Sequence, residues 1–99
     1  MIQVRDIFNL KFGKAKEAKA NLKDGLILIK KLGFEPGKVL TDLTGRSYRI
    51  VMETNFKDLA DMENALKSAF GNAEWSAWYQ KMVPLVDSAE REIFSVIEY

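Results

Sequence analysis

The sequence predicts a single α+β domain, residues 1–99, in which helices cover one face of a four-stranded sheet. A hairpin signal lies between residues 38 and 54, where two runs rich in β-branched and aromatic residues flank Leu43-Thr44-Gly45-Arg46. Helical periodicity lies on both sides of this hairpin, and one strand-like run lies towards each end of the chain. These observations predict the element order β-α-β-β-α-α-β.

The first strand is expected over residues 2–12. Its apolar residues recur with period two and are Ile2, Val4, Phe8, Leu10 and Phe12. Asp6 falls on the same face, so either a bulge near residue 6 shifts the alternation or Asp6 is a polar group that faces a partner. Bulges and satisfied polar groups are the commoner causes of such a break.

The first helix is expected over residues 14–32, ended by Gly33. Its buried stripe has three-four spacing and consists of Ala15, Ala18, Leu22, Gly25, Leu26, Ile29 and Leu32. Glycine costs a helix about 1 kcal/mol relative to alanine, so we expect Gly25 to let the helix lie close to the sheet. Ile27 and Leu28 interrupt the lysine-rich outer surface, which suggests a contact beyond the monomer.

The two hairpin strands carry apolar residues on both faces. Val39, Thr41 and Leu43 alternate with Leu40 and Asp42, and Tyr48, Ile50 and Met52 alternate with Arg49, Val51 and Glu53. A sheet with helices on one side normally exposes its other side to water, so this mixed polarity predicts that the second face is also covered. A chain of 99 residues has no further layer for this purpose, and a second copy is the economical solution.

Two helices and a strand complete the domain. Asp58 is expected to cap a helix that Gly71 ends, with the spacing of a capping box. The inner face of this helix is expected to consist of Leu59, Met62, Ala65, Leu66, Ala69 and Phe70. Asn72 is expected to cap the next helix, which Pro84 ends or kinks, and residues 91–99 form the last strand. With right-handed crossovers, this order folds as a ferredoxin-like sandwich with strand order 4-1-3-2 in an antiparallel or mixed sheet.

Composition excludes several kinds of site. The chain has no cysteine, which removes disulfides, thiolate nucleophiles and iron–sulfur sites, and no histidine, which removes an imidazole base and a proximal haem ligand. A metal site would need oxygen ligands alone and no EF-hand spacing is present, so we expect neither a metal nor a cofactor. No apolar run approaches the length of about 20 residues that spans a bilayer, so we expect no membrane partner. No signal-peptide pattern opens the sequence, and we expect a cytoplasmic protein.

The net charge of +1 is unevenly distributed. Residues 1–31 carry eight Lys/Arg and three Asp/Glu, whereas the rest of the chain carries seven and eleven. Opposed ends of this kind favour self-association or an anionic ligand near the basic end. They are too weakly charged for a dedicated nucleic-acid binder, and residues 46–53 lack the pattern of an RNA-recognition strand, so we expect no nucleic-acid partner.

Several short runs, most of them in the second half of the chain, match a known pattern. They are Phe56-Lys57-Asp58-Leu59-Ala60-Asp61-Met62-Glu63, Glu74-Trp75 with Trp78, Pro84-Leu85-Val86, Arg91-Glu92-Ile93 and, near the start, Phe12-Gly13-Lys14. In these runs the chain resembles the NIPSNAP family. The resemblance implies a dimeric α/β barrel, in which two ferredoxin-like sheets face each other and enclose a lumen. That superfamily includes cofactor-independent monooxygenases, dehydratases and haem-degrading enzymes, but the haem-using relatives depend on a histidine that this chain lacks. The resemblance brings no established chemistry for the family itself.

Eight residues are candidates for a ligand pocket. Three of them, Arg5, Arg49 and Glu53, lie on polar strand positions where a lumen would be, and together with Asp6 they form a polar constellation for a small-molecule pocket. A buried Arg91 would need a partner, for which we expect Asp6 or Glu53, and an ion pair that fixes the sheet or the dimer explains the same residues. The remaining three, Trp75, Trp78 and Tyr79, could form an aromatic wall for a flat ligand. Such a stripe at helical spacing is more often core or subunit contact.

Two functions follow from these candidates. The first is a small homodimeric binding or interaction protein whose lumen holds a small apolar or aromatic molecule. The second is a cofactor-independent monooxygenase or isomerase that acts on an aromatic or polyketide-like substrate, with Asp6 or Glu53 as base and Arg49 or Arg91 holding an enolate. An open pocket with a carboxylate of raised pKa would favour the enzyme, and a pocket filled by side chains would favour the binding protein or scaffold.

Overall fold

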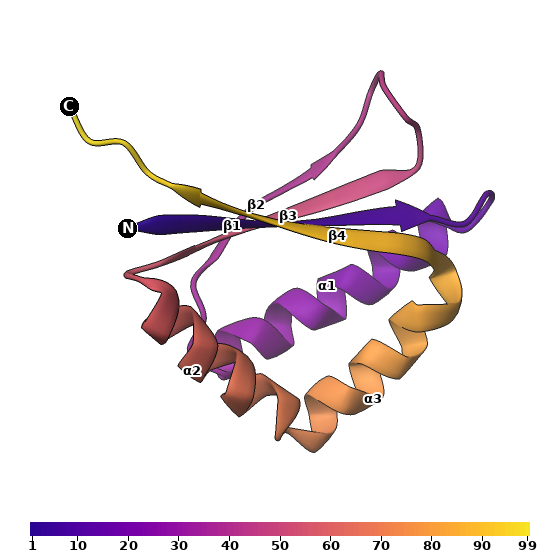
Figure 1. The fold of residues 1–99 in the computed structure, drawn as a ribbon. Helices are drawn as coiled ribbons and strands as arrows, with labels where there is room; N and C mark the ends of the chain where they lie inside the picture. Colours follow the sequence, from indigo (N-terminus) through magenta and orange to yellow (C-terminus); the bar gives the residue numbers. More distant parts are fainter.

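The computed structural model describes residues 1–99 and confirms the expected order of elements (Figure 1). The strands are β1 (Ile2–Leu10), β2 (Pro36–Thr41), β3 (Arg49–Phe56) and β4 (Val86–Ser95). The helices are α1 (Ala15–Lys31), α2 (Leu59–Phe70) and α3 (Ala73–Met82), and a short 3-10 turn, η1 (Val83–Leu85), joins α3 to β4. None of the helices combines the length and the apolarity that crossing a bilayer requires.

The four strands form one antiparallel sheet in the order β2-β3-β1-β4, which is the predicted order read from the opposite edge. All three helices lie against one face of this sheet (Figure 1). The fold is therefore the ferredoxin-like sandwich that the sequence predicts. Because side chains alternate along a strand, Val4 and Met52 face the helices while Arg5 and Glu53 face the other side.

The core lies between α1, α3 and the sheet. Its buried residues are Leu10, Ala18, Leu22, Leu28, Ile29, Ile50, Met52, Trp78, Met82 and Leu85. Leu28, expected on the outer surface of α1, is only 8% exposed, whereas its neighbour Ile27 is 58% exposed. The apolar stripe of α1 is thus wide enough to contact α3 as well as the sheet.

At Gly25, α1 packs closely against α3. A Cβ atom built on Gly25 would lie 2.5 Å from the indole ring of Trp78. The expectation of a close approach at this glycine is confirmed, but its direction was wrong, because the neighbour is α3 rather than the sheet.

Both predicted helix caps are confirmed. The Asp58 carboxylate accepts a hydrogen bond from the Asp61 backbone N–H at 2.8 Å, and the Asn72 side chain accepts one from the Trp75 backbone N–H at 3.0 Å. Capping side chains satisfy N–H groups that have no partner inside the helix. They therefore fix where α2 and α3 begin, and with that the positions of the aromatic residues of α3.

The hairpin loop is longer than predicted. It covers residues 42–48, and Tyr48, expected in the second strand, lies in the loop with a positive φ of 54° beside Ser47 at 67°. Asp42 holds this loop closed, because its carboxylate accepts hydrogen bonds from the backbone N–H and from Nε of Arg49, both at 3.1 Å. Gly45 in the sequence predicted a turn, but the contacts between Asp42 and Arg49 determine the length of the loop.

The last strand also differs from its predicted bounds. β4 begins at Val86 rather than Arg91 and ends at Ser95, so residues 96–99 lie beyond the strand. The run Asp87-Ser88-Ala89-Glu90 has weak β propensity. It forms a strand because it pairs along β1, where Phe8 is opposite Ala89.

The helix-free face of the sheet has no covering layer from this chain. The hairpin loop and the C-terminal segment both rise on that side (Figure 1). Their tips carry exposed apolar side chains, with Leu43 98% and Ile97 73% exposed, and Leu40 and Phe94 are each 43% exposed on the strands between them.

Candidate functional site

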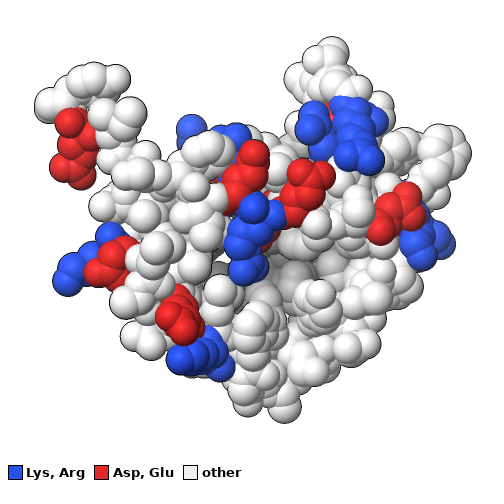
Figure 2. All heavy atoms as spheres, viewed as in Figure 1, with Lys and Arg blue, Asp and Glu red and all other residues white.

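A cavity of about 320 Å³ lies between the sheet and the helices. It is lined by 19 residues, 15 of them hydrophobic, drawn from every strand except β2, from all three helices and from the α1–β2 connection. The lining residues are Val4, Asp6, Phe8, Ile29, Phe34, Met52, Thr54, Phe56, Met62, Leu66, Ala69, Phe70, Trp75, Trp78, Tyr79, Met82, Ala89, Glu90 and Arg91. Figure 2 shows that the face in front of this region is hollowed, with acidic and basic groups gathered at the sheet side of the hollow.

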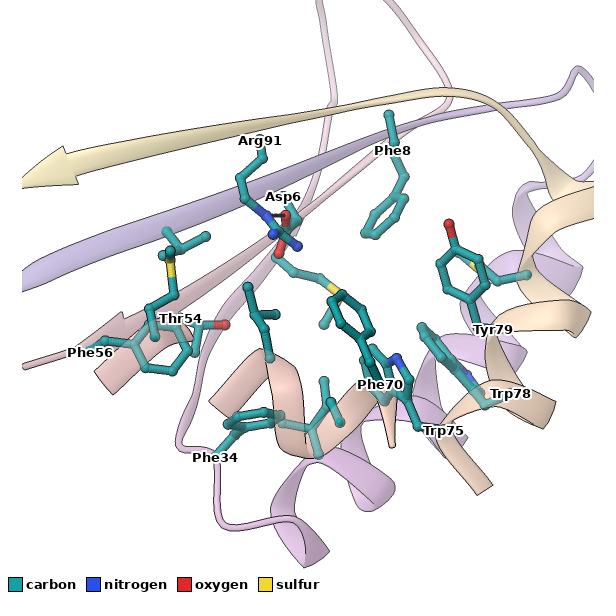
Figure 3. A pocket seen from close by; sticks show the side chains of 18 of the residues that line it. Asp6, Phe8, Phe34, Thr54, Phe56, Phe70, Trp75, Trp78, Tyr79 and Arg91 are labelled. Carbon is teal, nitrogen blue, oxygen red and sulfur yellow. Dashed lines mark hydrogen bonds and ion pairs between the residues drawn. The ribbon is translucent and has the colours of Figure 1, made fainter. Parts of the chain in front are cut away.

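An ion pair between Asp6 and Arg91 lies in the sheet wall of the cavity (Figure 3). The two residues are register partners on β1 and β4, and Arg91 Nε donates a hydrogen bond to Asp6 Oδ1 at 2.7 Å. No register shift occurs near residue 6, so Asp6 breaks the apolar alternation as a polar group with a partner and not through a bulge. Of the two carboxylates expected for Arg91, the structure selects Asp6.

The Arg91 side chain keeps unused hydrogen-bonding capacity. Its hydrogen bond to Asp6 uses Nε, and its terminal nitrogens point down into the cavity (Figure 3). The side chains of Asp6 and Arg91 are 26% and 43% exposed, so the pair lies between protein and solvent. The arrangement presents N–H donors to a space whose other walls are largely apolar.

The three aromatic candidates of α3 all line the cavity. The rings of Trp75 and Trp78 are 5.0 Å apart at 39°, and Trp78 Nε1 donates to the backbone carbonyl of Asn21 at 2.7 Å. Trp78 is therefore both a core residue and part of the cavity wall, so both interpretations of the aromatic stripe hold for this residue. Tyr79 is 51% exposed at the edge of the cavity (Figure 3).

The inner face of α2 supplies lining residues that the sequence assigned only to packing. Met62, Leu66 and Phe70 belong to the predicted apolar stripe of this helix, yet Ala69 is its only buried residue. α2 runs away from the sheet along its length (Figure 1), and its stripe lines the cavity. Phe8, Phe34 and Phe56 complete the aromatic lining, and only their hydrophobicity in the sequence could have pointed to them.

The other three candidates lie on the helix-free side of the sheet. Arg5 and Glu53 form an ion pair at 3.0 Å, and the Arg5 guanidinium lies 5.3 Å from the centre of the Phe94 ring. Arg49 pairs with Asp42 in the hairpin. The eight candidates thus separate into a cavity group of five and a group of three on the opposite face of the sheet.

Asp42, the partner of Arg49, has a carboxylate with a perturbed pKa. The hydrogen bond from the backbone N–H of Arg49 lowers the pKa of Asp42 below its ordinary value of 3.8, and the Arg49 side chain adds to the effect. Both contacts favour the charged carboxylate. Asp42 is remote from the cavity, so its role is to hold the hairpin.

Comparisons with known proteins agree with this fold. A model of the NIPSNAP family matches residues 4–99. The chain is similar to the crystal structure of an uncharacterized NIPSNAP domain protein from Burkholderia xenovorans, with a TM-score of 0.93, 17% identity and coverage of 100% of this chain and 97% of that one. It is also similar to a NIPSNAP family protein from Agrobacterium tumefaciens, with a TM-score of 0.93, 15% identity and coverage of 99% and 87%.

A more distant likeness is to a variant of SnoaB, a cofactor-independent oxygenase from Streptomyces nogalater. The TM-score is 0.75 at 13% identity, with coverage of 99% of this chain and 94% of that one. At such identities these structures show the common fold alone. No curated protein matches the sequence.

Proposed function

Because the chain belongs to the NIPSNAP family, whose model matches residues 4–99, we propose that it is a small homodimeric protein that binds a small apolar or aromatic molecule. The observation that carries this proposal is the cavity of about 320 Å³ with 15 hydrophobic residues among its 19 lining residues. Ligand sites in proteins are typically concave, about 300–1,000 Å³ in volume and mostly apolar, with a few convergent polar groups. The cavity fits that description, with Asp6 and Arg91 as the polar groups.

The cavity supports a binding site inside each protomer, between sheet and helices. The lumen between two sheets, where the sequence put the candidate pocket, has Arg5 and Glu53 paired with each other. Ligand binding and dimer formation therefore use opposite faces of the sheet in this proposal.

Calorimetric titration with 2-acetylnaphthalene, a flat apolar probe, tests the binding proposal. We expect one molecule bound per chain. Ala89→Phe places a ring in the cavity and is expected to weaken binding at least tenfold, whereas Ala60→Phe, on an exposed position of α2 that does not line the cavity, leaves it unchanged. Absence of binding to the wild-type chain, or equal binding to the Ala89→Phe variant, contradicts the proposal.

We propose that the dimer forms through the helix-free face of the sheet. Exposed apolar side chains on the sheet, such as Leu40 and Phe94, lie between the hairpin loop and the C-terminal segment, where a second copy would bury them. Sedimentation equilibrium at micromolar concentration should give twice the chain mass of 11.3 kDa. A species of 11.3 kDa alone would falsify the dimer. A cytoplasmic location is part of the same proposal, and fractionation of the source cells tests it.

A second candidate function is cofactor-independent oxygenation of an aromatic ketone. It is favoured by the carboxylate and guanidinium that Asp6 and Arg91 bring into an apolar cavity, and by the similarity of the fold to a cofactor-independent oxygenase. In such a reaction a carboxylate removes an acidic C–H proton and a guanidinium stabilises the enolate. Oxygen uptake with anthrone tests it, since anthrone and O2 give anthraquinone and water. If the wild-type protein consumes oxygen no faster than the Asp6→Asn variant, the oxygenase function is contradicted and only the binding function remains.

A further inference from the structure

We propose that the Asp6–Arg91 pair makes the cavity selective for ligands that carry a neutral hydrogen-bond acceptor, such as a ketone or amide carbonyl, on a flat apolar body. This inference rests on the proposed binding function and specifies the ligand class of the same site. Arg91 contacts the acceptor, and Asp6 is a positioning residue that acts through Arg91.

Donor geometry is the first part of the argument. A guanidinium has five N–H donors in a planar fork. Arg91 directs its Nε to Asp6 at 2.7 Å, which fixes the plane of the fork and leaves the terminal nitrogens to point into the cavity (Figure 3). An acceptor on a bound ligand would meet donors that are already oriented, whereas a ligand without an acceptor would desolvate them and leave them unpaired.

Charge is the second part. The charged side chains that face the cavity are those of Asp6 and Arg91, so the one positive group is paired with one negative group. Glu90 is opposite Ile7 in the register, so its side chain faces the helix-free side, where it lies 4.0 Å from Arg46 of the hairpin loop. No uncompensated cation remains in the cavity. An anionic group would meet the donors of Arg91 together with the charge of Asp6. The field therefore favours a neutral acceptor over a carboxylate.

The apolar walls define the rest of the ligand. Phe8 projects from the sheet towards Trp75 and Phe70, which come from the helices (Figure 3). A planar ring system between them would place its acceptor under Arg91. Aromatic walls favour a flat body over a globular one because rings stack at close range.

Three probes of nearly equal shape separate these effects. They are 2-acetylnaphthalene, which has a neutral carbonyl, 2-isopropenylnaphthalene, in which a methylene replaces the carbonyl oxygen, and 2-naphthoate, which is anionic. We expect 2-acetylnaphthalene to bind the wild-type protein about tenfold more tightly than either of the others, since a site that presents unpaired donors discriminates against analogues that lack the acceptor.

Variants assign the preference to the pair. Arg91→Met replaces the guanidinium by apolar atoms on a side chain of similar length. In this variant 2-acetylnaphthalene and 2-isopropenylnaphthalene should bind equally. Asp6→Asn leaves the charge of Arg91 uncompensated and should reverse the order between 2-acetylnaphthalene and 2-naphthoate. Arg5→Met and Glu53→Gln alter the ion pair on the opposite face and serve as matched controls in which the wild-type order is kept.

The outcomes separate the two proposals. If none of the three probes binds, the binding function fails and this inference with it. If all three bind the wild-type protein equally, or if Asp6→Asn keeps the wild-type order, the selectivity is overturned while the binding function stands. If Asp6→Asn does not fold, as judged by its circular dichroism, Arg91→Met decides alone: a retained preference for the carbonyl overturns the inference.

Discussion

Arg91 Nε lies 2.7 Å from Asp6 Oδ1, in a contact between residues that are 85 positions apart in the chain. Asp6 is on the central strand β1 and Arg91 on the edge strand β4, where the two are register partners. The contact therefore fixes the edge of the sheet and also places two charged groups in the wall of the cavity.

A double-mutant cycle measures what this pair contributes to folding. With Asp6→Ala, Arg91→Ala and the double variant, urea unfolding should give a coupling free energy of about 1 kcal/mol, because partly exposed ion pairs are weak. The side chains are 26% and 43% exposed, which supports a value at that modest level. The same cycle on Lys67 and Glu63, an exposed pair within α2, is the control and should give less. Equal coupling in both cycles would contradict the assigned geometry.

Gly25→Ala should destabilise the protein by about 1–3 kcal/mol, although alanine is the better helix former. The added Cβ would lie 2.5 Å from the Trp78 ring, which is held in place by its hydrogen bond to Asn21. Thermal unfolding measures the change. Ala20→Gly on the exposed side of α1 calibrates the intrinsic helix effect. A Gly25→Ala variant more stable than the wild type would show that α1 and α3 are not this close.

Hydrogen exchange should identify α2 as the least protected helix. α2 has one buried residue, Ala69, whereas α1 has five. Few buried contacts allow local opening at low free-energy cost. We expect α2 amides to exchange at least tenfold faster than those of α1, and to slow when 2-acetylnaphthalene occupies the cavity that Met62, Leu66 and Phe70 line. Protection of α2 equal to that of α1 would contradict the expected local opening of α2.

Acid should loosen the hairpin through Asp42. The hydrogen bond from the Arg49 backbone N–H lowers the pKa of Asp42 in the folded state. The charged carboxylate therefore stabilises the fold at pH values above its ordinary pKa of 3.8. This contribution is lost as the pH falls through the lower, folded-state pKa. The pH dependence of unfolding below pH 4 should therefore be shallower in Asp42→Asn than in the wild type. Parallel curves for the two proteins would exclude the Arg49 contact.

The sequence predicted the fold well because periodicity and helix caps act locally. Alternation over residues 2–10 and the three-four stripe of α1 follow from which side chains are buried, and Asp58 and Asn72 cap helices through neighbours three residues away. The start of β4 was missed because residues 87–90 become a strand through pairing with β1, which local propensity does not contain.

The candidate site was predicted less completely because a cavity depends on the distance between layers. Asp6 was found as a polar residue on an apolar face, and Trp75 and Trp78 as an aromatic stripe. No sequence signal shows that α2 stands away from the sheet, so Phe70 was assigned to the packed face of this helix. For the same reason the pocket was predicted on the helix-free face of the sheet. Arg5 and Glu53 lie on strand positions that would face a lumen. The sequence did not show that they pair with each other, because that pairing depends on the register of β1 and β3.

The location of the bound ligand tests the central claim most directly. Nitrogen-15 NMR resolves the indole N–H signals of the two tryptophans, Trp75 and Trp78, and the side-chain amide of Asn9, which lies on the other side of the sheet. Addition of 2-acetylnaphthalene should shift both indole signals and leave Asn9 unchanged. A shift of the Asn9 amide with unchanged indole signals would place the ligand on the helix-free face and contradict a site between sheet and helices.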